Sequence, residues 1–264
     1  MDLTNKTALL TGASGGIGEA IAHAFANKGC RLLLVGRDET KLTALQQSLP
    51  NAQNRHQLIL ADITAPKGRQ QMLECCQQEG VDLLINAAGI LDFQLLEYQD
   101  PGSVEQTILT NLLAPMLLCQ ALIGELKQRK EAAIINIGSI FGSIGHPGFT
   151  SYCASKSGLK GFTEALRREL ADSAIKVFYL APRATETALN SEAVTALNQA
   201  LGNKVDSPQQ VADELLKLLS KGRQQAFMGW PEKLFVTLNA VFPSIVHNAL
   251  VKKLPIVKQH VRQQ

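Results

Sequence analysis

The sequence has little excess charge and lacks the basic stripe that binds nucleic acid. Its 264 residues include 26 Lys and Arg against 23 Asp and Glu, which gives a formal net charge of +3. An excess this small argues against a nucleic-acid partner. Hydrophobic residues make up 45% of the chain and charged residues 19%, which is typical of a globular protein and not of a disordered one.

Paired cysteines are also absent. The five cysteines are Cys30, Cys75, Cys76, Cys119 and Cys153, an odd number with no C-x-x-C spacing. The pattern favours reduced thiols over a disulfide framework, and we expect no metal site and a cytoplasmic location. Cys153 is interpreted as a small helix residue and not as a nucleophile.

An uncharged stretch near the C-terminus does not predict a membrane span. Residues 234–251 carry no formal charge but include Asn239, Pro243, Ser244, His247 and Asn248, so the stretch is too polar and too broken. Because a strand-like run and a glycine-rich turn stand at the start of the sequence, we expect no secretory signal there.

A tyrosine and a lysine four residues apart are the most informative feature that is present. Tyr152 and Lys156 would lie one turn apart on the same face of a helix. A phenol keeps its proton to about pH 10, and a neighbouring ammonium is expected to lower that pKa. The pair could then exchange a proton with a carbonyl or hydroxyl oxygen. Taken alone, the spacing also fits an exposed pair on a surface helix.

A glycine-rich turn near the start predicts a dinucleotide site. The apolar run 7–10 fits a buried parallel strand, and Ile17, Ile21 and Phe25 then recur at helical spacing until Gly29. Between them stand Gly12, Gly16 and Gly18, spaced G-x-x-x-G-x-G. Glycines here allow the backbone to approach a pyrophosphate at the amino end of the helix.

The end of the second predicted strand favours NADP(H) over NAD(H). The strand covers residues 31–35 and is followed by Gly36 and Arg37. An acidic residue at this point would bind a ribose 2′-hydroxyl, but none is present. A guanidinium suits a 2′-phosphate. Ser14 is a further candidate phosphate contact, and the alternative for Arg37 is a solvated loop residue.

Further strands are predicted at residues 58–61, 81–85, 133–137, 175–180 and 225–228. Helices are predicted at residues 38–49, from Pro66 to Gly80, from Asp100 and Pro101 onward, through Tyr152 to about Leu170, and from Ser207 and Pro208 onward. Asp62 and Ile63, Asn86 to Gly89, and Ser139 each follow a strand, at the edge where open α/β sheets bind ligands. Pro115 cannot donate to the carbonyl of Asn111, so we expect a kink there and a carbonyl free to hold water.

Together these residues resemble the short-chain dehydrogenases/reductases, from residue 5 to about 228. The resemblance implies one Rossmann-type α/β domain, a doubly wound sheet of seven parallel strands flanked by helices. It also implies a catalytic tetrad. Tyr152 would be the general acid/base, and Lys156 would bind the nicotinamide ribose and lower the tyrosine pKa. Ser139 would orient the substrate oxygen, and Asn111 would hold a relay water.

The residues expected to bind the cofactor are Gly12, Ser14, Gly16, Ile17, Gly18, Arg37, Asp62, Ile63, Asn86, Ala87, Gly89, Tyr152, Lys156, Pro182, Thr185 and Thr187. In the motif that begins at Pro182, the resemblance assigns the carboxamide to Thr187 and support of the ring to Thr185. Arg183 replaces the usual glycine of this motif. It either alters the local backbone or shapes the substrate pocket.

The chain after the last strand is basic and apolar. We expect residues 1–229 to form the Rossmann-type domain and 230–264 a helical extension packed on it. The extension carries five basic residues and one acidic residue, so its net charge is +4 and the remainder carries −1. It could pack on the core or on a second subunit, which we favour, cover an apolar pocket, or lie on an anionic membrane surface.

These features predict an NADP(H)-dependent oxidoreductase that interconverts a carbonyl and an alcohol on a hydrophobic small molecule. Residues 187–206 would form a mobile substrate lid, and His146 and Phe149 would border the pocket. The resemblance implies a homodimer or homotetramer. The alternatives are a nucleotide-binding regulator on the same fold and a membrane-surface protein.

Overall fold

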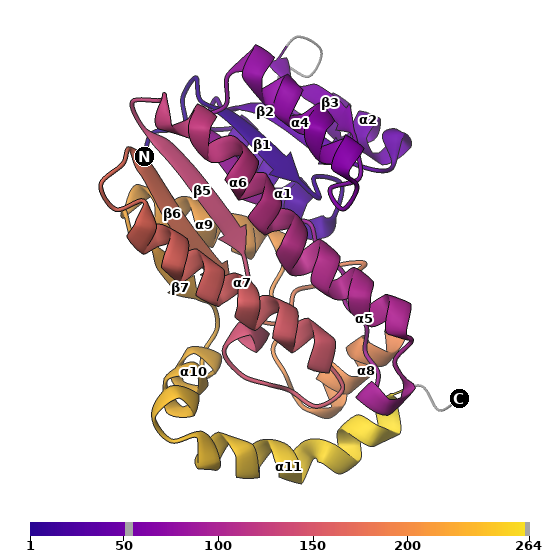
Figure 1. Cartoon of the computed structure of the whole chain (residues 1–264). Coiled ribbons are helices and arrows are strands. Elements are labelled where there is room, and N and C mark those ends of the chain that lie inside the picture. Colours follow the sequence, from indigo (N-terminus) through magenta and orange to yellow (C-terminus); the bar gives the residue numbers. More distant parts are fainter. Residues whose placement is uncertain (51–54, 262–264) are drawn as a thin grey trace.

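The computed structural model describes residues 1–50 and 55–261. Within these residues seven parallel strands form one sheet in the order β3-β2-β1-β4-β5-β6-β7 (Figure 1). The strands are β1 (Thr7–Thr11), β2 (Arg31–Gly36), β3 (Gln57–Leu60), β4 (Leu83–Asn86), β5 (Ala132–Ile137), β6 (Ile175–Ala181) and β7 (Gln225–Phe227). The chain reverses its direction of winding between β1 and β4, where open sheets bind ligands. The predicted fold class is confirmed.

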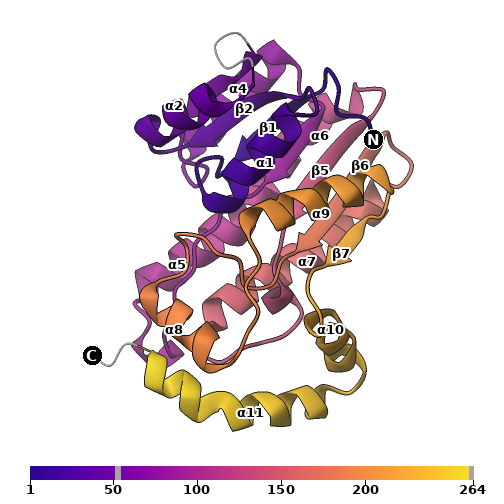
Figure 2. The ribbon, with the colours of Figure 1, turned by 180° about the vertical axis from the view of Figure 1, so that it is seen from behind.

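Helices cover both faces of the sheet, which is why its central strands are apolar on both sides. One apolar cluster joins the sheet to α1 (Gly16–Ala26), α2 (Glu39–Ser48) and α9 (Pro208–Ser220) (Figure 2). The opposite cluster joins it to α4 (Pro66–Glu79), α6 (Ala114–Lys127) and α7 (Thr150–Glu169). Every residue of β1, β4 and β5 is buried.

Helix starts follow the capping residues of the sequence. The Asp100 carboxylate accepts a hydrogen bond from the Ser103 amide at the start of α5 (Pro101–Ile108). Ser207 and Gln210 form a reciprocal capping box before α9. Such caps satisfy amides that lack partners within the helix, so these predicted helix starts are confirmed.

A π-helical turn, Leu109–Leu113, joins α5 to α6 where the sequence predicted a kink. The turn ends just before Pro115, which has no N–H with which to continue the α-helical pattern. Among the described residues, the combined helical run Pro101–Lys127 is long and apolar enough to span a membrane by length and composition alone. However, 44% of its most apolar window is buried in this protein, and α6 packs on β4 and β5.

A line of buried polar side chains crosses from the sheet to α7. The Asn86 amide donates to Asn136 Oδ1 (2.8 Å), and the Asn136 amide donates to Thr163 Oγ1 (2.9 Å). Asn86 and Asn136 are direct partners in the register of β4 and β5. The bonds satisfy most of the polar atoms of this line inside an otherwise apolar layer.

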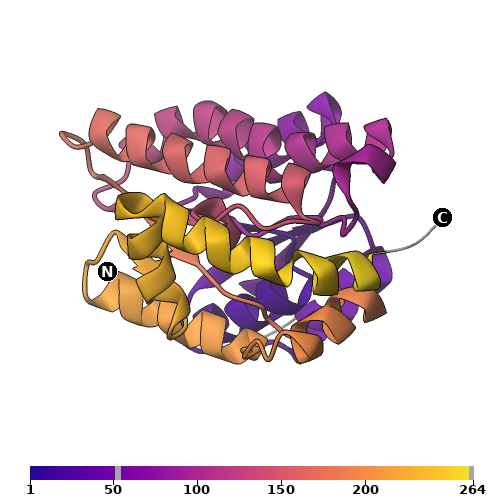
Figure 3. The same cartoon turned by 90° about the horizontal axis from the view of Figure 1, so that it is seen from below.

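Two helices, α10 (Glu232–Val241) and α11 (Pro243–His260), form the C-terminal extension, which we define as residues 230–264. Figure 3 shows α11 crossing the end of the molecule below the sheet. Val246 packs with Ile140 and Tyr179, and Val257 packs with Phe93 and Phe149. Within residues 230–261, the exposed large hydrophobic side chains are Trp230, Leu234, Phe235, Val241, Phe242, Ile245 and Val251.

Candidate active site

The glycine-rich turn lies against the loop that follows β4. Gly12 has φ +65°, and a Cβ on it would lie 2.6 Å from the Ala88 Cα. Only glycine therefore permits this backbone approach. Gly15 precedes α1 without a side-chain cap, so the first amides of α1 remain available to a phosphate. The turn thus has the narrow, small-residue form that a pyrophosphate requires.

Residues 182–187, here called the cofactor loop, reach the same turn from the end of β6. A Cβ on Gly16 would lie 2.9 Å from the Thr187 Cγ2. The residue predicted to hold a carboxamide is therefore next to the predicted pyrophosphate turn, although 171 positions separate the two in sequence. The residues present fit a dinucleotide.

Arg37 and Asp62 lie at the ends of neighbouring strands, β2 and β3. Burial works against ionisation of Asp62, but hydrogen bonds from Thr64 and the positive charges of Arg37 and Arg69 outweigh it and lower the carboxyl pKa. The Asp62 Oδ1 accepts from the Thr64 amide at 2.8 Å and from its hydroxyl at 2.7 Å. Arg37 is exposed at this edge, so its guanidinium is accessible to a ligand.

Tyr152 and Lys156 lie on the buried face of α7, as the four-residue spacing predicted. They are 8% and 5% exposed, and the Lys156 Nζ lies 5.8 Å from the centroid of the Tyr152 ring. The ammonium donates to the Ile137 carbonyl at 3.0 Å. Burial lowers the pKa of Lys156 to about 8.

The predicted lowering of the tyrosine pKa by Lys156 is wrong for this structure. Burial raises the pKa of Tyr152 to about 12, and a hydrogen bond with the Ser139 hydroxyl only partly offsets the rise. The reason is that the loss of hydration disfavours a phenolate more than the available partners favour it. The phenol therefore keeps its proton at neutral pH.

Asn111 lies in the π-helical turn and is fully buried. Its side chain accepts from the Ile90 amide at 2.8 Å and donates to the Ile90 carbonyl at 2.8 Å. It also donates to the Ser155 Oγ at 3.1 Å. Asn111 thus joins the loop after β4 to α7, a side-chain role that the sequence did not reveal. Its predicted role in holding water through the main-chain carbonyl stays a prediction.

Tyr179 is a second residue that sequence reasoning missed. Its hydroxyl lies 3.5 Å from the Ser139 amide nitrogen and donates to the Ser139 carbonyl at 3.4 Å. A Cβ on Gly138 would overlap the Tyr179 ring, so glycine at this position allows the contact. Tyr179 therefore holds the backbone of Ser139, and the only sequence signal was a glycine at the end of β5.

A cavity of about 450 Å³ opens beside Ser139 and Tyr152. Its walls include Phe141, His146 and Phe149, and the ring centroids of Phe141 and His146 are 5.0 Å apart. The expectation that His146 and Phe149 border a pocket is confirmed. Val194 and Leu197 of α8 (Glu192–Ala200) line it from the predicted lid, and Phe235, Ile245, Val246, Ala249 and Leu250 line it from the extension.

The structure brings most of the predicted residues to the carboxyl edge of the sheet. The cavity includes Ile17, Ser139, Tyr152, Pro182, Thr185 and Thr187. A Cβ on Gly89 would lie 3.3 Å from the Asn111 Oδ1 and 3.6 Å from the Lys156 Nζ, which places these three residues together. By contrast, the side chains of Asn86 and Ile63 are buried in protein contacts, so any cofactor contact of theirs rests on the main chain.

Comparisons with known proteins agree with this geometry. A family model described as short chain dehydrogenase matches residues 6–198. The chain is 32% identical over 244 residues to the 3-oxoacyl-acyl-carrier-protein reductase FabG of Vibrio cholerae, covering 90% of this chain and 95% of that protein.

Two solved structures are similar over most of the chain. The 3-ketoacyl-acyl-carrier-protein reductase of Brucella melitensis, complexed with NADH, is 26% identical with a TM-score of 0.79 and covers 87% of this chain and 99% of its own. A short chain dehydrogenase of Burkholderia cenocepacia in complex with NADP is 24% identical with a TM-score of 0.80, over 95% of this chain and 99% of that one, a likeness of fold.

Proposed function

Because the chain belongs to the short-chain dehydrogenase/reductase family of oxidoreductases, we propose that it uses NADP(H) to interconvert a carbonyl and an alcohol on a hydrophobic substrate. The observation that carries this proposal is the position of Tyr152, which lies with Ser139 in the wall of a cavity that the cofactor loop also lines. The nicotinamide, when bound, supplies or accepts a hydride at the carbonyl carbon.

Side chains of this protein transfer the proton and orient the substrate oxygen. The Tyr152 phenol, protonated at neutral pH, donates its proton to the carbonyl oxygen as negative charge develops there. The Ser139 hydroxyl donates a hydrogen bond to the same oxygen and orients it. Lys156 holds a positive charge at the end of β5 close to the phenol, and Asn111 fixes the adjacent loop.

The preference for NADP(H) rests on Arg37. Its guanidinium is exposed at the end of β2 and lies close enough to Asp62 to lower the pKa of that carboxyl. Gly36 offers no carboxylate that would repel a 2′-phosphate. A guanidinium forms paired, charge-assisted hydrogen bonds with phosphate, which supports this assignment.

The walls of the cavity support a hydrophobic substrate. The ring of Phe141 packs edge-on against that of Tyr152 and beside that of Phe149, and side chains from α8 and α11 add to the apolar lining. Two relatives are named as reductases of 3-oxoacyl or 3-ketoacyl groups carried by acyl-carrier protein. An aliphatic chain attached to the reacting carbonyl fits both observations.

Two surfaces support proposals about assembly. The half-exposed run Pro101–Lys127 would form a homodimer or homotetramer interface, and Leu113 is 41% exposed on it. The exposed apolar side chains of the extension, together with Lys233, Lys252 and Lys258, would contact an anionic membrane surface.

A cytoplasmic location is supported by five cysteines that are all buried and unpaired.

The proposed function is tested by NADPH oxidation with a panel of aldehydes and ketones. Replacing Tyr152→Phe removes the proton donor and should lower kcat by about 100-fold or more. Tyr98→Phe is the matched control, because Tyr98 is exposed and is not among the residues that line the cavity. Full activity in Tyr152→Phe would refute the assignment and favour a nucleotide-binding regulator on the same fold.

A further inference from the structure

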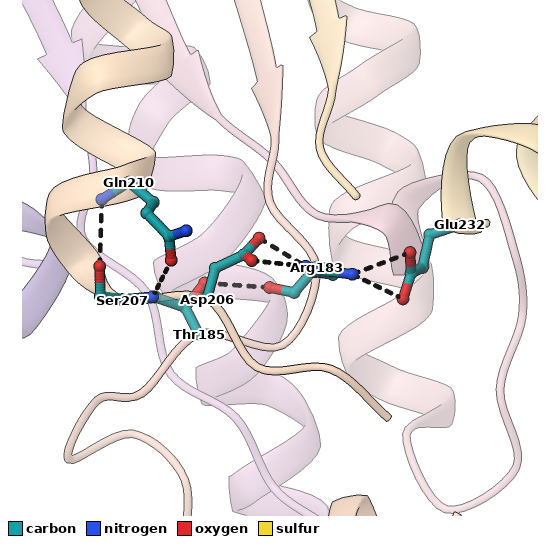
Figure 4. A network of polar contacts seen from close by, with 6 residues as sticks. All are labelled: Arg183, Thr185, Asp206, Ser207, Gln210 and Glu232. Carbon is teal, nitrogen blue, oxygen red and sulfur yellow. Dashed lines mark hydrogen bonds and ion pairs between the residues drawn. The ribbon is translucent and has the colours of Figure 1, made fainter. Parts of the chain in front are cut away.

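Arg183, which stands where the family motif has glycine, lies at a junction of three segments. Its Nε and Nη2 donate to the two carboxylate oxygens of Asp206 at 3.0 and 2.7 Å (Figure 4). Its Nη1 donates to both carboxylate oxygens of Glu232 at 3.4 and 3.2 Å. The three side chains are 14%, 7% and 23% exposed, so the ion pairs are poorly screened by solvent.

The Asp206 side of this junction fixes the cofactor loop. The Asp206 amide donates to the Ala184 carbonyl at 2.9 Å, and the Glu186 amide donates to the Asp206 carbonyl at 2.9 Å. These bonds form a short parallel bridge between Thr185 and Asp206. Thr187, two positions beyond the bridge, lies against Gly16 of the glycine-rich turn.

The Glu232 side reaches the C-terminal extension. Glu232 is the first residue of α10, and Pro231, Glu232 and Phe235 all line the cavity. Gly229 allows the approach, because it has φ +89° and a Cβ on it would lie 2.6 Å from both the Arg183 Cδ and the Glu232 Oε2. One side chain therefore connects the cofactor loop to a wall of the substrate cavity.

We propose that Arg183 is a positioning residue that couples dinucleotide binding on the cofactor loop to the placement of α10 over the substrate cavity. This coupling rests on the function proposed above, which supplies its two ligands, the dinucleotide and the hydrophobic substrate. A guanidinium fork can hold two carboxylates at once, whereas the single ammonium of lysine cannot match this geometry. Because such coupling is reciprocal, ordering of the loop by dinucleotide also orders α10.

The single tryptophan of the chain reports on this junction. Trp230 is 61% exposed and stands two residues before Glu232. We expect NADP⁺ to reduce acrylamide quenching of Trp230 fluorescence in the unmodified protein. In Glu232→Gln, which keeps the shape of the side chain but removes its charge, quenching without NADP⁺ should rise and the response to NADP⁺ should be lost.

Kinetics separate positioning from general destabilisation. Loss of one charged, half-buried contact should raise the KM for dodecanal by about 5- to 10-fold in Glu232→Gln, while kcat stays within about twofold. Arg183→Lys should show both this rise and weaker NADP⁺ binding, because it also loosens Asp206. Glu214→Gln removes an exposed ion pair to Lys217 on α9 and should change neither quantity.

Two results would overturn the proposal. One is quenching in Glu232→Gln and Arg183→Lys that equals that of the unmodified protein with and without NADP⁺. The other is an equal effect in Glu214→Gln. The quenching measured without NADP⁺ requires no catalysis, so failure of the proposed enzymatic function would leave this part of the test intact.

Discussion

At the scale of single residues, burial of the Lys156 ammonium has a free-energy cost that lowers the stability of the folded protein. It holds a buried ammonium whose pKa is lowered to about 8, from an ordinary value near 10.5, and the Ile137 carbonyl is its hydrogen-bond acceptor. Burying a charge without a carboxylate partner opposes folding. Lys156 therefore illustrates how an active site can be less stable than an apolar core of the same shape.

The free-energy cost of burying this ammonium predicts that the stability of the folded protein depends on pH. Below pH 8 both the folded and the unfolded chain hold the proton and the cost is fully present. Between about pH 8 and 10.5 the folded state releases the proton first, so the stability of the unmodified protein rises with pH. Lys156→Met should therefore be more stable at pH 7 by up to about 3 kcal/mol, an advantage that shrinks toward pH 10.

The measurement is chemical denaturation at a series of pH values from 7 to 10. Lys160→Met, one turn further along α7 at a partly exposed site, is the matched control for removal of an ammonium from this helix. A difference for Lys156→Met that stays flat over this range would contradict the assigned burial cost.

Cofactor preference is a second property that depends on single residues. Gly36→Asp places a carboxylate at the end of β2, which should repel a 2′-phosphate and shift the ratio of kcat/KM toward NAD(H) by about tenfold or more. A Cβ at this position meets Leu42 at 3.2 Å, so Leu42 must move slightly. Arg37→Ala, which adds no atoms, should shift the ratio in the same direction. Equal kcat/KM for both dinucleotides in the unmodified enzyme would contradict the assignment.

The sequence predicted these residues because their signals are local. A four-residue helical spacing places Tyr152 and Lys156 on one face, and a residue after a strand must lie at the carboxyl edge. Contacts between residues far apart in the sequence could not be predicted in this way. The bond of Tyr179 to Ser139 depends on the pairing of β5 with β6, and Arg183 finds its partners 23 and 49 residues away. The direction of the Tyr152 pKa depends on burial, which no spacing reveals.

At the scale of elements, Pro115 in the long helical run predicts a break in the α-helical pattern but not the geometry of that break. The sequence established that the α-helical pattern cannot continue through Pro115, and a kink is one response to that break. At this break the structure has a π-helical turn, in which the Ala114 amide bonds to the Leu109 carbonyl. Such turns often occur at functional sites, and this one contains Asn111.

Helix α11 was predicted as part of a helical extension, and covering an apolar pocket was one of the alternatives left open. The sequence could not choose among them, because the cavity wall exists only where distant elements meet. Ala249→Phe on this wall should reduce kcat/KM for dodecanal, by about fourfold for each methylene displaced from apolar contact, and leave propanal unaffected. Asn248→Phe is the control on the same helix, at an exposed position that does not line the cavity. Equal losses for both aldehydes would indicate a general distortion instead.

At the scale of the whole molecule, two surfaces with exposed apolar side chains predict separate behaviours. Leu113→Arg on the run Pro101–Lys127 should reduce the oligomer mass measured by light scattering and leave sedimentation with phosphatidylserine vesicles unchanged. Val251→Glu, at a site on α11 that is 50% exposed and does not line the cavity, should reduce vesicle binding and leave the mass unchanged.

Each variant serves as the control for the other. If Val251→Glu lowers the mass, the extension is a subunit interface and not a membrane contact. If deletion of residues 243–264 leaves vesicle sedimentation unchanged, the membrane proposal fails. If Leu113→Arg leaves the mass unchanged, the long helical run is not the interface.

The polar line through Asn86, Asn136 and Thr163 has a consequence for how the protein folds. A slip of β5 by one residue against β4 would leave two buried amides without partners, at a cost of about 1–3 kcal/mol for each. Misaligned pairings of β4 and β5 are therefore disfavoured. The surviving alignment is the one that sets Gly89 and Ser139, each three residues beyond a paired asparagine, at the same level of the sheet.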